Sequence, residues 1–172
     1  MPGTIALNFS NLKHFKNVRL IHDTVMGGRS DGLLTRLAEP AGLRFEGHLS
    51  LANNGGFASA EFALAQALPA VEFRTLELAA LADGRKYQLR LKTPFIPQGV
   101  AYVAEFQSSS QLQRYQFEPF NFRGQFRGRL VTGLPALNFS DVSHISLMLA
   151  DSNQGTFAIE LFTIQFSALQ SI

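Results

Sequence analysis

The sequence contains no cysteine and no tryptophan. Without a thiol, the chain cannot use a cysteine nucleophile, ligate an iron–sulfur cluster, build a zinc ribbon or form a disulfide. Charged residues are also scarce, at 16% of the 172 residues, whereas an average globular protein has about 25%. This composition argues against disorder, and the absence of thiols leads us to expect a cytoplasmic protein.

Long apolar runs are missing as well. No stretch approaches the roughly 20 consecutive apolar residues of a membrane-spanning helix, and the opening residues MPGTIALNFS lack the pattern of a signal or transit peptide. The net charge is only +2, which gives weak support to nucleic-acid binding. The length is sufficient for one domain that buries its own core. We therefore expect a single domain over residues 1–172, with membrane association, if any, only through a partner.

Alternation of apolar and polar residues dominates what is present. It runs through residues 43–51, 76–78, 86–92, 100–106, 115–117 and 145–149. A period of two is the pattern of a half-buried strand, and many short strands separated by glycine-rich turns predict a sandwich or barrel. Residues 156–166 are apolar on both faces, which predicts a central strand that is covered on both sides. Only residues 11–16 and 64–68 favour short helical turns.

The loop of residues 22–32 (HDTVMGGRSDG) is the first candidate for chemistry. His22 as a base, Asp23 as its orienting group and Ser30 as a nucleophile would form a hydrolytic triad. Adjacent residues on a strand point to opposite faces, however, so His22 and Asp23 cannot readily pair. The structural alternative is that Asp23 accepts hydrogen bonds from backbone N–H groups of a tight glycine turn, and we favour it.

Other candidate sites are also better explained as turns. Residues 26–30 and 54–57 lack the spacing of a phosphate-binding loop, and we expect Gly28 and Gly56 to hold positive φ angles. Residues 151–155 begin like a calcium loop, but Phe162 stands where the bidentate glutamate should be. The four histidines lie too far apart in sequence to suggest a metal site. These histidines are His14, His22, His48 and His144. We expect no cofactor and no metal.

Two further interpretations stay open. Residues 115–129 interleave phenylalanine with arginine, which could stack on and neutralise a nucleic-acid strand, although phenylalanines beside Pro119 are more typical of core plugs. A hydrolase or isomerase on a sandwich would need Asp23 to converge with a second carboxylate such as Glu46 or Glu105.

Three motifs in order resemble the complex I intermediate-associated protein family: residues 23–30 (DTVMGGRS), 45–51 (FEGHLSL) and 53–59 (NNGGFAS). Downstream, residues 83–89 (DGRKYQL) resemble the D-G-R-x-Y segment of the family, and shorter matches occur at residues 126–128 and 155–157. The resemblance spans about residues 15–166. The signature residues are Asp23, Met26, Gly27, Gly28, Ser30, Asn54, Gly55, Gly56, Phe57, Asp83 and Gly84.

The resemblance implies an all-β jelly-roll sandwich of the galactose-binding-domain-like type. It also implies a non-catalytic, chaperone-like module that binds a protein partner, because members of the family help to assemble NADH:ubiquinone oxidoreductase. The absence of a mitochondrial extension suggests a free-standing bacterial member. We expect Arg29, Arg85 and Tyr87, which flank the signature turns, to contact that partner. The alternative is a carbohydrate-binding module that uses Tyr87, Tyr102 and Tyr115 as sugar platforms, although tryptophan anchors are missing.

Overall fold

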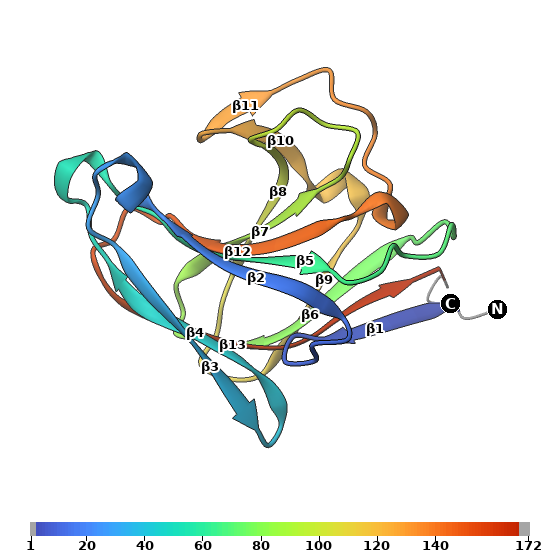
Figure 1. Cartoon of the computed structure of the whole chain (residues 1–172), viewed down its shortest axis with the longest axis horizontal. Coiled ribbons are helices and arrows are strands. Elements are labelled where there is room, and N and C mark those ends of the chain that lie inside the picture. Colours follow the sequence, from blue (N-terminus) through green and yellow to red (C-terminus); the bar gives the residue numbers. More distant parts are fainter. Residues whose placement is uncertain (1–2, 169–172) are drawn as a thin grey trace.

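The computed structural model describes residues 3–168; the side chains of Val25, Met26 and Asn54 lie outside the described part, so two of the signature residues, Met26 and Asn54, are described by backbone alone. The described strands form two antiparallel sheets that pack face to face (Figure 1). The predicted all-β sandwich is therefore confirmed.

The smaller sheet has six strands. Their order is β3 (Asp31–Ala38), β4 (Ala41–Leu49), β13 (Gly155–Ser167), β6 (Thr75–Leu81) and β9 (Gln113–Phe117), and β1 (Thr4–Asn8) pairs with β13 beyond the end of β4. The long strand β13 is the spine of this sheet, because β4 and β1 pair with successive parts of one edge and β6 pairs with the other.

The larger sheet has seven strands. Their order is β11 (Arg129–Val131), β10 (Arg123–Phe126), β8 (Val100–Gln107), β7 (Lys86–Lys92), β12 (His144–Leu149), β5 (Ala58–Leu64) and β2 (Phe15–His22). Single turns of 3₁₀ helix connect strands at η1 (Asp23–Met26), η2 (Ala52–Asn54), η3 (Pro119–Asn121) and η4 (Phe139–Asp141). Within residues 3–168, none of these helical segments has the length and apolar character needed to cross a bilayer.

Phenylalanine fills the space between the sheets. The chain has 16 phenylalanines, and rings on both sheets and on the turns η3 and η4 touch edge to face or tilted, as in the run Phe117, Phe122, Phe139 and Phe166. Burying one such ring stabilises the fold by roughly 1.5–3 kcal/mol. Among the phenylalanines of the segment 115–129 that were expected to plug the core, Phe117 and Phe122 are buried, whereas Phe120 and Phe126 are 77% and 39% exposed.

Two expectations about secondary structure are wrong. The helical turn expected at residues 64–68 is absent, because Leu64 is still part of β5, with its N–H bonded to Ser143 O at 3.0 Å. At residues 11–16 a single turn does form, in which Asn11 O accepts from His14 N at 3.0 Å and from Phe15 N at 3.2 Å, before β2 begins at Phe15. Strand β13 is central as predicted, but its outer face is not covered by a further layer of described residues. A bulge between Leu161 and Thr163 resets the alternation, so two apolar residues in succession do not mean that both faces are buried.

Candidate functional site

Four strand connections meet at one end of the sandwich, at the left of Figure 1. They are β2–β3, β4–β5, β6–β7 and β12–β13, and the register brings their strand ends together, with His22 opposite Ala58, Ala58 opposite Leu149 and Leu49 opposite Gly155. We call this region the loop end and define it as residues 23–30, 50–57, 82–85 and 150–156. It contains most of the sequence signatures, although they are far apart in the chain.

Asp23 holds the first half of the loop end together. Its carboxylate is fully buried and accepts hydrogen bonds from Ser30 N (2.9 Å), Ser30 Oγ (2.6 Å), Gly56 N (2.5 Å) and Phe57 N (3.2 Å). Burial raises the pKa of Asp23, but the hydrogen bonds from Ser30, Gly56 and Phe57 outweigh it, and the pKa lies below that of an ordinary aspartate. Asp23 therefore joins the DTVMGGRS turn to the NNGGFAS turn as a buried anion.

The two glycines expected to hold positive φ differ from each other. Gly56 has φ +142°, as expected, whereas the positive φ of the first turn belongs to Gly27, at +88°. Gly28 is required for a different reason: a Cβ there would lie 2.4 Å from Asp23 Cγ. The glycine thus makes room for the buried carboxylate rather than for an unusual backbone angle.

The triad interpretation of His22, Asp23 and Ser30 is wrong. Ser30 Oγ donates a hydrogen bond to Asp23 and accepts one from Ser50 N at 2.9 Å, so its partner is Asp23 and not the imidazole of His22. His22 Nδ1 accepts from Ser59 N at 3.2 Å, and the imidazole stacks on Phe45. Burial lowers the pKa of His22 although Ile21 and Asp23 act in the opposite direction, so the ring is neutral at pH 7.

Arg85 holds the second half of the loop end together. Its guanidinium binds Asp151 through both carboxylate oxygens, with Nε–Oδ2 at 2.9 Å and NH2–Oδ1 at 2.7 Å. It also donates to the backbone carbonyls of Asn153, Gly155 and Thr156. Hydrogen bonding to Asp151 raises the pKa of Arg85. Arg85 therefore fixes the turn of residues 151–155, the segment whose sequence begins like a calcium loop.

Asp83 and Tyr87 complete this half. Asp83 Oδ1 accepts from Arg85 N at 3.1 Å, and Asp83 Oδ2 accepts from Tyr87 Oη at 3.0 Å and from Ala158 N at 2.9 Å. The D-G-R-x-Y segment is thus an internal clamp between the β6–β7 turn and β13. Burial raises the pKa of Tyr87.

The structure places only one of the three expected partner contacts on the surface. Arg29 is exposed, beside the buried Ser30. Tyr87 is fully buried, so the expectation that it contacts a partner is wrong, and the guanidinium of Arg85 is already occupied by internal acceptors. The alternation had placed Tyr87 on the apolar face of β7 with Leu89 and Leu91, and this signal of burial was available in the sequence.

The sugar platform expected from the tyrosines is also absent. Tyr102 is buried and donates to Pro135 O at 2.6 Å, and Tyr115 packs against Phe106 with its hydroxyl buried. Tyr87 is buried too, and only Tyr115 is partly exposed, so the three rings do not form a common platform at the surface.

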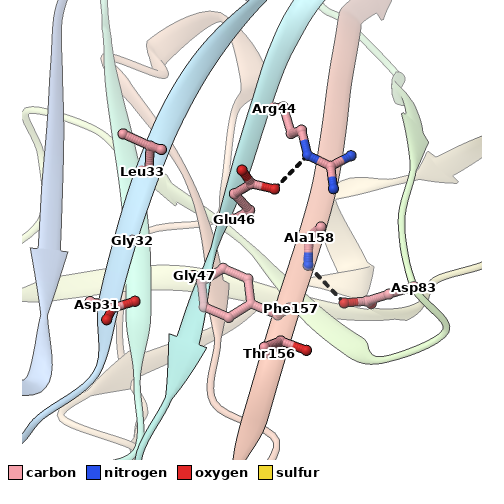
Figure 2. Close-up of a pocket in the computed structure, with 10 residues that line it drawn as sticks. All are labelled: Asp31, Gly32, Leu33, Arg44, Glu46, Gly47, Asp83, Thr156, Phe157 and Ala158. Atoms are coloured by element: carbon pink, nitrogen blue, oxygen red, sulfur yellow. Dashed lines mark hydrogen bonds and ion pairs between the residues drawn. The ribbon is translucent and has the colours of Figure 1, made fainter.

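A shallow hollow of about 600 Å³ lies next to the loop end, on the outer face of the smaller sheet (Figure 2). Three carboxylates surround it, and each already has a partner: Asp31 accepts from His48 N, Glu46 pairs with Arg44 at 2.6 Å, and Asp83 accepts from Ala158 N. Asp23 is enclosed in the signature turns and Glu105 lies on β8 of the other sheet, so the expected convergence of Asp23 with Glu46 or Glu105 does not occur. Among the described residues, no group of three or more histidine and acidic side chains is placed to hold a metal ion.

Comparisons with known proteins agree with this geometry. The sequence model of the family named Complex I intermediate-associated protein 30 (CIA30) matches residues 7–161. No curated protein sequence matches the chain.

Several solved structures share the fold. A family 11 carbohydrate-binding module from Clostridium thermocellum, in complex with a β-1,3-1,4-mixed-linked tetrasaccharide, has a TM-score of 0.64 at 14% identity and covers 96% of this chain and 98% of its own. The family 11 module of the Clostridium thermocellum cellulase Lic26A-Cel5E gives 0.62 at 14% identity, with 98% and 96% covered. A family 29 carbohydrate-binding module gives 0.51 at 10% identity, with 96% and 89% covered. At these identities the likeness shows the fold alone.

Proposed function

Since the chain belongs to the Complex I intermediate-associated protein 30 family, we propose that it is a non-catalytic assembly module. It binds a protein partner, a subunit of NADH:ubiquinone oxidoreductase or of another redox complex, while that complex is being built. The loop end is the surface that we assign to this contact.

The observation that carries the proposal is the network of hydrogen bonds that connects the loops of the loop end. The buried Asp23 and the partly buried Arg85 each join two of the four connections. The two halves are linked by a hydrogen bond from Leu51 N to Gln154 Oε1 at 3.4 Å. A surface whose loops are already fixed loses little conformational entropy when it binds, and a larger share of the contact energy becomes affinity. The residues of the family signatures form the hydrogen bonds within this surface and are not assigned to catalysis.

The exposed rim supplies the contacts. Leu51 is 42% exposed, and Arg29 and Asn53 are exposed beside it. An apolar side chain flanked by an arginine and an amide is typical of a protein interface, where arginine makes charge-assisted hydrogen bonds and the apolar group is desolvated. Catalysis is not part of the proposal, because the hydroxyl of Ser30 and the carboxylates of Asp23, Asp83 and Asp151 are committed to structural hydrogen bonds.

Carbohydrate binding is the alternative, and the likeness of fold to carbohydrate-binding modules motivates it. The inward tyrosines count against it, because stacking on a sugar ring needs an exposed aromatic face. Calorimetry with a β-1,3-1,4-linked tetrasaccharide separates the two functions: saturable heat with the sugar would favour the alternative, and its absence is expected.

The proposal is tested by photo-crosslinking in the native cell. A photoreactive amino acid replaces Arg29 or Leu51 at the loop end and, as matched controls, Arg74 or Phe95. Both control residues are exposed and lie at the opposite end of the sandwich, before β6 and after β7. We expect subunits of a redox complex to be crosslinked from the first pair only. Crosslinks from neither position of the loop end, together with unchanged NADH:ubiquinone oxidoreductase activity after deletion of the gene, would refute the proposal.

A further inference from the structure

One side of the sandwich is open between two free strand edges. β2 is an edge of the larger sheet and β3 is an edge of the smaller one, and within residues 3–168 no strand pairs with the outer side of either. Each is eight residues long, whereas the other edge strands, β1, β9 and β11, have five, five and three residues. Proteins usually keep free edges short or covered, because unpaired N–H and C=O groups invite another strand.

The space between these edges is apolar. A hollow of about 190 Å³ lies there and is lined by Phe9, Ser10, Asn11, Leu12, Phe15, Val18, Leu34, Arg36 and Leu43. We call it the side slot. It adjoins the β1–β2 crossover, residues 9–14. The strands that flank it, β2 and β3, are joined at their other ends by the signature turn of residues 23–30.

Two leucines on this side of the sandwich lack cover: Leu12, which lines the slot, and Leu20, which lies beyond it on β2. Leu20 lies opposite Ala60 in the register of β2 with β5, and Ala60 is completely buried, so Leu20 faces the interior of the sandwich. It is nevertheless 40% exposed, and Leu12 at the crossover is 73% exposed. The inner face of β2 is therefore apolar but only partly covered by the smaller sheet.

The rim of the slot is basic. The sequence has no aspartate or glutamate before Asp23, and Lys13, Lys16 and Arg19 are all exposed along the crossover and β2. On β3, exposed Arg36 donates to Ser10 O at 3.0 Å and so reaches across the slot. Four positive side chains thus surround a strip of apolar side chains and a row of unpaired backbone groups.

We infer that this slot receives an extended segment of a partner polypeptide, apolar at alternate residues and acidic at the residues between, which adds as a strand to the free edge of β2. A strand supplies the backbone N–H and C=O groups that the edge lacks, and its period of two sends every second side chain into the slot. The intervening carboxylates face the basic rim, which favours acidic partners over others. The inference rests on the proposed function in taking the partner to be a protein, and it adds the place and the chemistry of the contact.

The test uses the full chain and a fluorescein-labelled peptide of ten alternating valine and glutamate residues. We expect saturable binding by fluorescence anisotropy, weakened by salt, and at least tenfold weaker binding of the matched peptide with lysine in place of glutamate. Leu20→Glu and the double variant R19E/R36E should each weaken binding at least tenfold. The control Arg74→Glu, at an exposed arginine away from the slot, should bind as the unmodified protein does.

Circular dichroism and a melting curve establish that each variant is folded, and Leu20→Ser replaces Leu20→Glu if the latter does not fold. Equal affinity for the glutamate and lysine peptides, or binding that is indifferent to the variants in the slot, would overturn the inference. A photoreactive residue at Leu20 separates this result from the proposed function. Crosslinks to redox-complex subunits from Leu51 but not from Leu20 would refute the slot and leave the assembly role intact.

Discussion

Replacing Asp23 with alanine should cost more stability than any other single change at the loop end. The substitution removes the acceptor of four hydrogen bonds. Ser30 Oγ can turn to Ser50 O, which lies 3.2 Å away, so three backbone N–H groups are left without a partner. Each buried unpaired donor costs about 1–3 kcal/mol, and water can reach the partly exposed turn at Gly56. We therefore expect a loss of about 3–5 kcal/mol in the free energy of unfolding.

Urea unfolding measured by circular dichroism gives this difference directly. In a melting experiment, about 3–5 kcal/mol corresponds to a fall in Tm of roughly 6–20 °C for a domain of this size. Glu72→Ala is the matched control, because Glu72 is exposed and a surface change of this kind stays within about 0.5 kcal/mol.

The charge of Asp23 can be tested separately with Asp23→Asn. The pKa of Asp23 in the folded protein is lowered, whereas an unfolded aspartate titrates near 3.9. A lowered carboxyl pKa stabilises the fold fully above about pH 5, and the contribution is lost as the pH falls through the folded pKa. The stability gap between the unmodified protein and Asp23→Asn should therefore narrow as the pH falls from about 5 to 2. A gap that is constant with pH, or an unchanged Tm for the alanine variant, would refute the role of a buried anion.

Three further predictions concern Arg85, the tyrosines and Gly28. Arg85→Ala should lose about 2–4 kcal/mol in urea unfolding because Asp151 and three carbonyls lose their donor, while exposed Lys86→Ala should change little; equal effects would contradict the clamp. Burial raises the pKa of all three tyrosines, and the chain has no other tyrosine and no tryptophan. Their stabilising contribution is complete below pH of about 10 and is lost as the pH rises through the folded pKa. The folded protein should thus show less tyrosinate absorbance at pH of about 10.5 than urea-unfolded protein does; equal absorbance would mean that the rings are accessible. Gly28→Ala should lose more than about 2 kcal/mol because its Cβ would lie 2.4 Å from Asp23 Cγ, and Gly84→Ala, which has open space but φ +87°, should lose only about 1 kcal/mol.

The alternation of side chains was sufficient to predict the strands, because each strand buries one face and the sequence records which one. β7 illustrates this: Leu89 and Leu91 are buried while Lys86 stays exposed. Alternation does not record interruptions. The bulge beside Phe162 on β13 lies where two apolar residues follow one another. Nothing in the local sequence distinguishes such a bulge from a strand that is buried on both faces.

The candidate site was harder to predict for a physical reason. Asp23 and Gly56 are brought together by tertiary structure, and so are Arg85 and Asp151, whose side chains meet across 66 positions of sequence. A motif shows that a residue type is required at a position but not whether its side chain points outward. Arg85 is required for its ion pair with Asp151 inside the protein. Only the folded structure reveals that the charge of Arg85 is already neutralised by this neighbour.

The position of β13 has a consequence for how the protein is made. Residues 155–167 form the spine of the smaller sheet, and they are synthesised after β1, β4 and β6, the three strands that they join. Until then these strands have no partner along the edge that β13 will occupy, and pairings over such long sequence separations form slowly. Until β13 has been synthesised, the nascent chain therefore contains apolar strands that are free to pair wrongly. A protein that we assign to the assembly of others therefore passes through a stage in which its own sheet depends on a strand that emerges after the strands with which it pairs.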